Sequence, residues 1–245
     1  EALLRQEWEE IAGYIVSQGM RVALISNGYI IDRDIASRIK DTGIYLVALS
    51  LDGLEHSHNT VRGHRDSFSR VCDAAVMLKK TGIRTNFVTH VNTLNLSELS
   101  RMEKLAETIG IDVWRIQLGA PLGRFKQHPE LVIRPEVLVR VADFIVDAKQ
   151  RKKVTISVGD NIGYFSSHES ILRDTPDRKG IPFWCGCAAG CLNIGIEANG
   201  NVKGCLSLQS DQFIEGNVRE QSLKEIWTQK GNFSYTRDFK AENLL

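Results

Sequence analysis

Long hydrophobic runs are absent from this sequence of 245 residues. A membrane-spanning helix needs about 18 or more consecutive apolar residues, and no such run occurs, so the sequence predicts no membrane span. The first segment, EALLRQEWEEIAGYIV, has the pattern of a charged amphipathic helix. It lacks the basic stretch followed by an apolar stretch that marks an export signal. We therefore expect a cytoplasmic protein.

An excess of charge of either sign is also missing, because 31 Lys and Arg residues accompany 30 Asp and Glu residues. The formal charge of +1 gives none of the basic excess that nucleic-acid binding requires. With 42% hydrophobic and 25% charged residues, the composition is that of an ordinary globular protein. The sequence predicts neither a nucleic-acid nor a membrane partner.

Cysteine is scarce except in one segment, WCGCAAGCLNIGIEANGNVKGC, which holds Cys185, Cys187, Cys191 and Cys205. Cytoplasmic thiols stay reduced, which favours metal binding or redox chemistry over disulfides. Thiolates select zinc or iron–sulfur clusters, and the spacing leaves both open, together with buried cysteines that bind nothing. The fifth cysteine, Cys72, lies in a helical pattern and is expected in the core.

Helical and strand patterns alternate over the first 158 residues. Five short apolar segments, each preceded by a helical pattern, are predicted as strands: 21–26, 45–50, 83–91, 112–119 and 154–158. Repeated helix-then-strand units predict parallel strands with helical crossovers. Because these segments are rich in Val, Ile and Leu and lack clean alternation, we expect both sheet faces to be covered. The predicted fold class is α/β, either a barrel or a doubly wound sheet.

Polar residues follow the ends of four predicted strands, in the segments 26–28, 50–53, 90–92 and 117–119. In parallel α/β folds the ligand lies at the carboxyl ends of the strands. One ligand could therefore contact all four segments. His90 itself is expected to be a hydrogen-bonded residue of the sheet, and His56, His58 and His64 are expected to be polar loop residues.

A smaller module is predicted from about residue 160, where the helix and strand alternation stops. Within it, the segment 193–205 reads as two short strands about an Asn199-Gly200 turn, which is a strong hairpin signal. A tight hairpin brings its ends together, so Cys205 is expected to return close to Cys187 or Cys191.

The cysteine segment resembles the start of the SPASM or twitch region that follows the barrel of radical SAM enzymes. There, a cysteine leads through a hairpin to a glycine, and four further residues lead to the next cysteine. Here Cys187 or Cys191 leads to Gly200, and Cys205 follows Asn201-Val202-Lys203-Gly204. The next segment, IEGNVREQSLKEIW, is similar to the stretch that follows the cluster hairpin in that family.

The first half also resembles radical SAM enzymes. The opening EALLR is similar to the end of the family's GGE motif, ISNG to its third-strand motif, and SLDG with VRGHRDSF to its fourth-strand region. By this resemblance, S-adenosylmethionine would be bound through its amino group, its ribose and its carboxylate. The implied residues are Glu1, Asn27, Ser50, Asp52 and Arg62, with Asn92 and Gln117 as further polar or adenine contacts.

The resemblance implies two domains and a radical enzyme. Residues 1–159 would form strands three to six of the barrel, and residues 160–245 an auxiliary [4Fe-4S] domain whose ligands are the four clustered cysteines. The implied reaction is hydrogen abstraction from a peptide or protein substrate by a 5'-deoxyadenosyl radical, as in maturases of ribosomal peptides. A ferredoxin or flavodoxin would supply electrons.

The family's C-x3-C-x2-C loop would precede Glu1, and further SPASM cysteines would follow residue 245. We therefore expect the chain to be part of a longer enzyme and inactive alone. Two alternatives stay open. The chain could be a zinc-stapled α/β binding module without catalysis, or a barrel lyase that uses Asp52, His90 and Glu197 in acid–base chemistry.

Overall fold

The computed structural model describes residues 1–159, 162, 167–174 and 187–238, and it divides the chain into two compact units, 1–184 and 185–245. Each unit is described by itself. The domain boundary predicted near residue 160 falls inside the first unit. Beyond it, helix α7 (Glu169–Arg173) contacts helix α6 (Leu138–Arg151) and strand β5 (Thr155–Val158).

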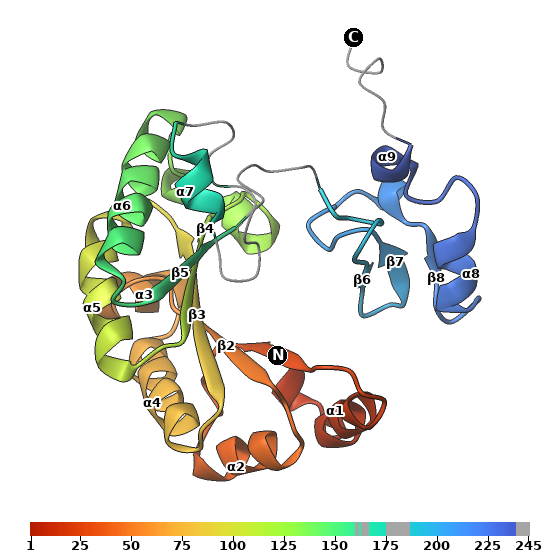
Figure 1. Ribbon diagram of the computed structural model, residues 1–245, viewed down its shortest axis with the longest axis horizontal. Helices are drawn as coiled ribbons and strands as arrows, with labels where there is room; N and C mark the ends of the chain where they lie inside the picture. The colour runs from red at the N-terminus through yellow and green to blue at the C-terminus, as the bar shows by residue number, and fades with distance from the viewer. Residues whose placement is uncertain (160–161, 163–166, 175–186, 239–245) are drawn as a thin grey trace. The chain divides into compact units, whose positions relative to one another are not determined.

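The first unit is built on a five-stranded parallel sheet of strand order β1-β2-β3-β4-β5 (Figure 1). Its other strands are β1 (Ala23–Ser26), β2 (Leu46–Ser50), β3 (Arg84–Val91) and β4 (Val113–Leu118). Each strand pairs in parallel with the next along the chain. The predicted parallel α/β fold is therefore confirmed, and all five predicted strand segments form strands.

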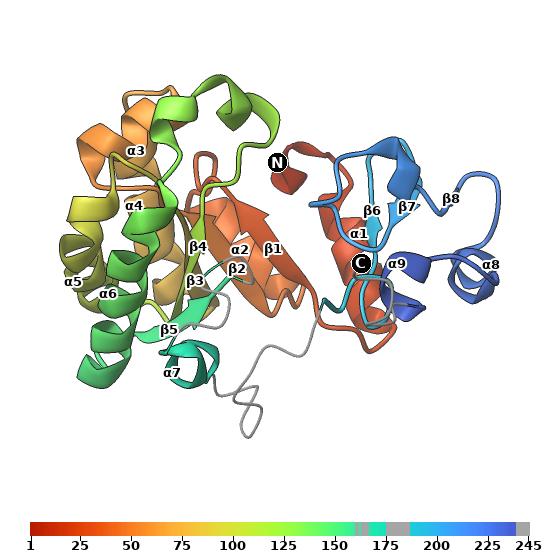
Figure 2. The same ribbon diagram turned by 90° about the horizontal axis from the view of Figure 1, so that it is seen from above.

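Helices precede or connect the strands and cover one face of the sheet (Figures 1 and 2). They are α1 (Trp8–Ser17), α2 (Arg33–Asp41), α3 (Glu55–Arg62), α4 (Ser67–Lys80), α5 (Leu99–Ile109) and α6. Helix α3 was not predicted, because its sequence EHSHNTVR is polar and carries no apolar periodicity.

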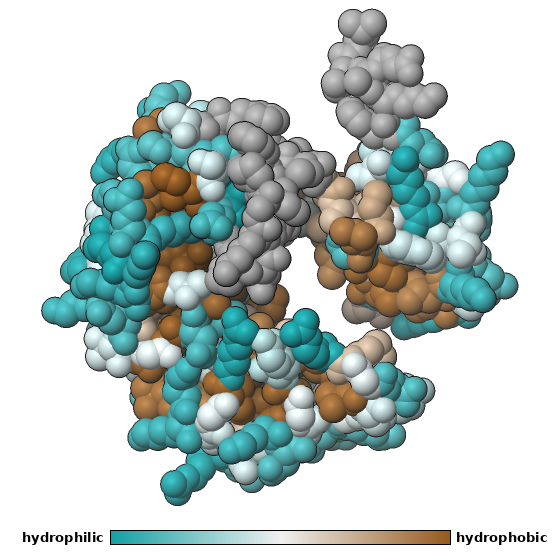
Figure 3. Space-filling model, viewed as in Figure 1, coloured by the Kyte–Doolittle hydropathy of each residue, from teal (hydrophilic) through white to brown (hydrophobic). Residues whose placement is uncertain are grey.

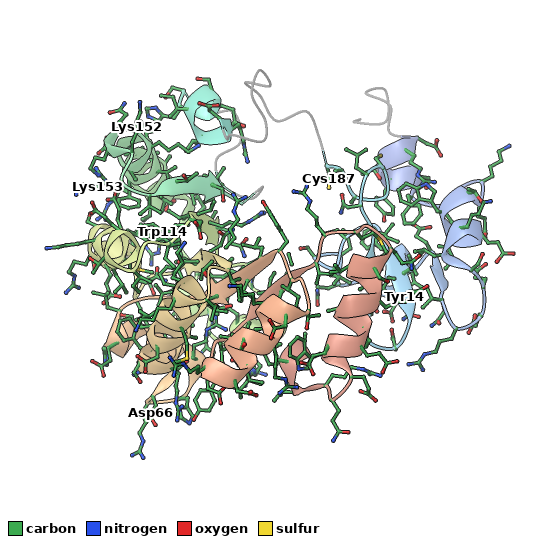
Figure 4. The ribbon with its side chains drawn as sticks, turned by 60° about the horizontal axis from the view of Figure 1, so that its bottom comes forward. Tyr14, Asp66, Trp114, Lys152, Lys153 and Cys187 are labelled. Carbon is green, nitrogen blue, oxygen red and sulfur yellow. The ribbon has the colours of Figure 1, made fainter. Side chains whose placement is uncertain are left out.

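The core lies between the sheet and these helices. Alternate strand residues are buried in it, among them Val47, Leu49, Phe87, Trp114 and Ile116. Figure 4 shows Trp114 among the strands and helices of this unit. The prediction that both sheet faces are covered is wrong within the described residues. Strand β3 alternates strictly between buried and partly exposed residues from Thr85 to Val91, because helices cover only one of its faces.

The second unit contains a three-stranded antiparallel sheet of strands β6 (Gly195–Ile196), β7 (Asn201–Lys203) and β8 (Gly216–Asn217). The predicted hairpin is present, with Ile196 opposite Val202. Gly200 in its turn has φ +94°, which glycine adopts readily. Helix α8 (Leu223–Thr228) begins with a capping box formed by Ser222 and Glu225. Helix α9 (Ser234–Arg237) follows.

A small apolar core holds the second unit together, with Val202, Ile226 and Phe233 fully buried. Apolar side chains also remain at the surfaces of both units, visible as brown atoms in Figure 3. Ile25 of β1 is 68% exposed and Leu192 is 87% exposed. Among the described residues, no helix has the length and apolar character needed to cross a membrane.

Candidate functional site

The carboxyl end of β1 is tied to the start of the chain. One carboxylate oxygen of Glu1, Oε2, accepts hydrogen bonds from the backbone N–H of Asn27 (3.0 Å) and from the hydroxyl of Ser26 (3.1 Å). The side chain of Asn27 turns back and accepts from the N–H of Tyr29. Two predicted site residues, Glu1 and Asn27, are therefore adjacent at this strand end.

Gly28 allows the chain to turn sharply after β1. Its φ is +76°, and a Cβ atom there would lie 3.1 Å from the Cα atom of Val71 on helix α4. A side chain at this position would be strained by both the backbone conformation and the contact. The close approach of the loop to α4 thus explains the glycine in the SNG motif.

Asp52 lies at the centre of the site, just beyond β2. Its side chain is only 3% exposed, and its carboxylate contacts the guanidinium of Arg62 at 2.5 Å. The other oxygen accepts from the backbone N–H of His90 at 2.9 Å, and Nδ1 of the same histidine lies 3.5 Å away. Asp52 thus joins the end of helix α3 to the end of strand β3.

These contacts keep the Asp52 carboxyl ionised. Burial alone would raise its pKa, but the hydrogen bonds from His90 and the charge of Arg62 outweigh burial and hold the pKa below its usual range. An ionised carboxylate that is buried needs such partners. With its oxygens occupied by Arg62 and His90, Asp52 positions these two residues.

His90 extends the network to β4, because its Nε2 lies 2.6 Å from the side-chain nitrogen Nε2 of Gln117. With the amide nitrogen as donor, the imidazole Nε2 accepts, and Nδ1 carries the proton that faces Asp52. We name the connected residues Arg62, Asp52, His90 and Gln117 the strand-end network. It spans the ends of β2, β3 and β4, and it includes three predicted site residues.

Asn92 and Ser50 have different surroundings. Asn92 is fully buried, and its Oδ1 accepts from the N–H groups of Leu94 and Asn95, while its Nδ2 donates to the carbonyl of His90. Its polar atoms therefore shape the loop after β3. Ser50 is half-buried at the end of β2 and has no side-chain hydrogen bond to another described residue.

His58 was wrongly predicted as a polar loop residue. It lies in helix α3, is fully buried, and accepts the backbone N–H of Asp52 on Nδ1 at 3.0 Å. Its Nε2 lies 3.0 Å from the hydroxyl of Ser67. Burial lowers the pKa of His58 to about 4, and the nearby charge of Asp52 opposes this only in part. The sequence offered no signal for it, because its neighbours in α3 are polar.

The second unit carries the cysteines. Cys187 and Cys191 are exposed and Cys205 is half-buried, whereas Cys185 lies outside the described residues. Sγ of Cys187 accepts from the N–H of Ala189, and Sγ of Cys205 accepts from the N–H of Ser207, each at 3.4 Å. Figure 4 shows Cys187 on this unit. Such N–H donors stabilise a thiolate and tune a bound cluster.

Tyr235 lies near two of these thiols. Burial raises the pKa of its phenol, and the neighbouring acidic groups Glu215, Cys187 and Cys205 raise it further. The phenol oxygen accepts from the N–H of Gly204, the residue before Cys205. Cys187 and Cys205 are therefore both close to the hydroxyl of Tyr235.

Close backbone packing holds this arrangement. A Cβ atom at Gly204 would lie 2.9 Å from the backbone nitrogen of Gly190 and would overlap the phenol oxygen of Tyr235. The segment before Cys191 and the segment before Cys205 are therefore in direct contact. A donor set of exposed and half-buried thiols on such a backbone fits an iron–sulfur cluster. Within the described residues, however, no three His, Cys, Asp or Glu side chains form a complete metal site.

Of the acid–base trio considered for a lyase, Asp52 and His90 are neighbours in the first unit. Glu197 belongs to the second unit, where its carboxylate pairs with the ammonium of Lys203 at 2.9 Å. The lyase interpretation therefore has only two of its three residues in one unit.

Two family models match the chain. The radical SAM superfamily model matches residues 1–106, and the model of the SPASM iron–sulfur cluster-binding domain matches residues 187–244. The first match covers the strand-end network up to His90, and the second covers the cysteine hairpin.

Curated relatives align along nearly the whole chain. An AdoMet-dependent heme synthase of Methanosarcina barkeri is 26% identical over 249 residues, covering 97% of this chain and 69% of that protein. The heme synthase of the same description from Oleidesulfovibrio alaskensis is 28% identical over 248 residues, covering 98% of this chain and 62% of that protein. The chain thus spans about two thirds of these relatives.

A solved structure shows the same fold at low identity. Streptococcus suis SuiB bound to S-adenosylmethionine superposes with a TM-score of 0.76 at 14% identity, covering 98% of this chain and 55% of SuiB. Together with the two domain matches, the likeness extends over both units. The chain therefore carries a radical SAM superfamily domain over residues 1–106 and a SPASM iron–sulfur cluster-binding domain over residues 187–244.

Proposed function

We propose that the first unit binds S-adenosylmethionine at the carboxyl ends of its strands, in an enzyme that abstracts hydrogen from its substrate. The strand-end network is the main support for this proposal, because it holds polar groups together at the carboxyl ends of β2, β3 and β4. When bound beside a reduced [4Fe-4S] cluster, S-adenosylmethionine supplies a 5'-deoxyadenosyl radical. We propose that residues 1–159 bind S-adenosylmethionine and that residues 160–245 bind the auxiliary cluster.

Two charged side chains, Glu1 and Arg62, each have a polar atom that can still form a hydrogen bond with this ligand. Oε2 of Glu1 already holds the β1 end, so its other oxygen, Oε1, is left to accept the methionine ammonium. Nε of Arg62 is buried without a hydrogen-bond partner among the described residues, although Nη2 of the same guanidinium contacts Asp52. A carboxylate of the ligand would satisfy that donor.

The remaining predicted contacts follow from their places in the fold. The unpaired hydroxyl of Ser50 is a candidate for the ribose, and the amides of Asn27 and Gln117 are candidates for polar groups of the ligand. We propose positioning roles for Asp52 and Asn92, because their polar atoms are engaged with protein groups.

In the second unit we propose an auxiliary [4Fe-4S] cluster bound by Cys187 and Cys205, with Cys191 and Cys185 as further candidates. The two N–H···S hydrogen bonds, and the closeness of both thiols to Tyr235, support the first two. We further propose that a ferredoxin or flavodoxin supplies the electrons, since a radical SAM cluster must be reduced.

The proposed substrate is a peptide or protein. SuiB supports this proposal, because a solved structure of that protein holds its precursor peptide SuiA. A second candidate is a tetrapyrrole that carries carboxylate groups. It is favoured by the AdoMet-dependent heme synthases, which align over 97–98% of this chain with higher identity than SuiB.

The test measures two quantities on the anaerobically reconstituted protein: production of 5'-deoxyadenosine from S-adenosylmethionine with dithionite, and the affinity for S-adenosylmethionine. We expect the wild type to produce 5'-deoxyadenosine. We expect Arg62→Gln to bind S-adenosylmethionine about 10- to 100-fold more weakly than the wild type. Arg33→Gln, which removes an exposed arginine from α2, is the matched control and keeps the wild-type affinity. Equal affinity in all three proteins would refute the assigned site.

A further inference from the structure

Helix α9 holds the loop that carries two of the cysteines. We name residues 187–191 the cysteine loop. The hydroxyl of Thr236 donates a hydrogen bond to the carbonyl of Ala189 at 2.5 Å, and Nε of Arg237 donates to the carbonyl of Gly190 at 2.7 Å. Both carbonyls belong to the cysteine loop, so two consecutive residues of α9 fix the backbone of this loop.

Tyr235, the residue before Thr236, reaches the end of the hairpin. Its phenol oxygen accepts from the backbone N–H of Gly204 at 3.0 Å, and Gly204 directly precedes Cys205. A Cβ atom at Gly204 would lie 3.0 Å from the carbonyl carbon of Ala189 and would overlap the phenol oxygen. The hydroxyl of Tyr235 therefore lies where the cysteine loop and the end of the hairpin come together.

The proton of this hydroxyl is not used in a hydrogen bond within the described part of the chain. A phenol keeps its proton at neutral pH and can donate it while its oxygen accepts another hydrogen bond. The oxygen of Tyr235 accepts from Gly204, but the hydroxyl donates to no described residue. The acidic groups close to it are Glu215, Cys187 and Cys205. A free donor therefore lies close to the two thiols that we propose as cluster ligands.

Hydrogen bonds to sulfur influence how easily an iron–sulfur cluster is reduced. A reduced cluster carries one more negative charge than the oxidised cluster, so donors that face its sulfur atoms stabilise the reduced form and raise the reduction potential. The N–H groups of Ala189 and Ser207 already donate to the sulfur atoms of Cys187 and Cys205. The hydroxyl of Tyr235 is a further donor near these sulfur atoms, and a substitution can remove it.

We propose that Tyr235 donates a hydrogen bond from its hydroxyl to a sulfur atom of the auxiliary cluster, and that this hydrogen bond raises the reduction potential of the cluster. Tyr235 does not bind iron and acts on the cluster only through the hydrogen bond. Helix α9 supports this role, because its contacts with the cysteine loop hold the hydroxyl and the thiols together. This inference rests on the proposed function, because it requires a cluster on the hairpin cysteines.

The experiment is a redox titration of the anaerobically reconstituted protein, followed by electron paramagnetic resonance. The signal of the auxiliary cluster is the one that Cys205→Ala removes. Tyr235→Phe removes only the hydroxyl. A second protein carries 3-fluorotyrosine at position 235, whose hydroxyl is a stronger donor because fluorine makes the phenol more acidic. The matched control is Thr236→Val, which removes a hydroxyl of the same helix that donates to a backbone carbonyl.

We expect Tyr235→Phe to lower the midpoint potential of the auxiliary cluster by about 59 mV, which corresponds to a tenfold change in a one-electron equilibrium constant. The protein with 3-fluorotyrosine should have a higher potential than the wild type. Thr236→Val should keep the wild-type potential, because the hydroxyl that it removes donates to a carbonyl oxygen and not to sulfur.

Two results would overturn the inference. One is an unchanged potential in Tyr235→Phe, and the other is an equal fall in Thr236→Val, which would show that α9 only holds the loop. If Tyr235→Phe retains no cluster, an unchanged or lower potential in the 3-fluorotyrosine protein would overturn the inference instead. Iron and sulfide are measured in the same samples. Their absence from the wild type, or a full set of signals in Cys205→Ala, would refute the proposed cluster itself, so the two failures are distinguishable.

Discussion

Acid should destabilise the first unit through His58. The backbone N–H of Asp52 donates to Nδ1 of this buried imidazole, so protonation of Nδ1 breaks the hydrogen bond and places a charge in the core. Burial lowers the pKa of His58 from 6.5 to about 4. The unfolded chain therefore binds more protons than the folded chain between these pH values, and stability falls as the pH decreases through this window.

The magnitude follows from the two pKa values. One pH unit is worth about 1.4 kcal/mol for each proton of difference. For pKa values of 6.5 and about 4, the free energy of unfolding is lower by roughly 2 kcal/mol at pH 5 and by at most about 3 kcal/mol below pH 4, relative to neutral pH.

The assay is urea unfolding at pH 7, 6 and 5, followed by circular dichroism, for the wild type, His58→Asn and His56→Asn. His58→Asn should be less stable than the wild type at pH 7, yet it should lose about 2 kcal/mol less between pH 7 and pH 5. His56, exposed on the same helix, is the control, and its variant should follow the wild type. An identical pH dependence in all three proteins would refute this account of His58.

Three further predictions concern four positions, two of which are compared with each other. Gly204→Ala should destabilise the second unit by about 2 kcal/mol or more, because the new Cβ overlaps its neighbours; a thermal melt that is unchanged would contradict the close packing. Glu103→Gln, which breaks the pair of a 6% exposed carboxylate with Arg151, should cost roughly 1–3 kcal/mol in urea unfolding. Glu107→Gln in the exposed pair with Lys153 should cost under about 1 kcal/mol; equal losses would argue against the burial effect. Glu1→Gln should weaken S-adenosylmethionine about tenfold in equilibrium dialysis, and unaltered binding would remove Glu1 from the site.

The sequence predicted the elements whose apolar pattern is regular. The parallel sheet follows from alternating helix and strand patterns, and the hairpin of the second unit follows from Asn199-Gly200. The sequence did not predict that the sheet face opposite the helices is uncovered, because Val88 and Val113 make β3 and β4 look covered on both sides. In the structure this face also carries Asn86 and the exposed Arg115, so it is only partly apolar.

The site could be predicted only as a set of strand ends. The order of the motifs placed Asp52 and Gln117 at strand ends on the same edge of the sheet, with β3 between their strands. It did not reveal that His90 of β3 connects them. That contact depends on side-chain directions across the sheet register, which no pattern in one strand determines. His58 was missed for a related reason, since burial of a polar helix residue depends on what packs against it.

The measurement that tests the account most directly is the iron, acid-labile sulfide and zinc content of the anaerobically reconstituted protein. The variants are Cys187→Ala and Cys205→Ala, and Cys72→Ala is the control. Burial raises the pKa of the Cys72 thiol to about 11, so this cysteine should not ligate metal. We expect iron and sulfide to be present in equal amounts and to fall in Cys187→Ala and Cys205→Ala but not in Cys72→Ala. Stoichiometric zinc without sulfide, or iron that is unchanged in both ligand variants, would contradict an iron–sulfur cluster on this hairpin.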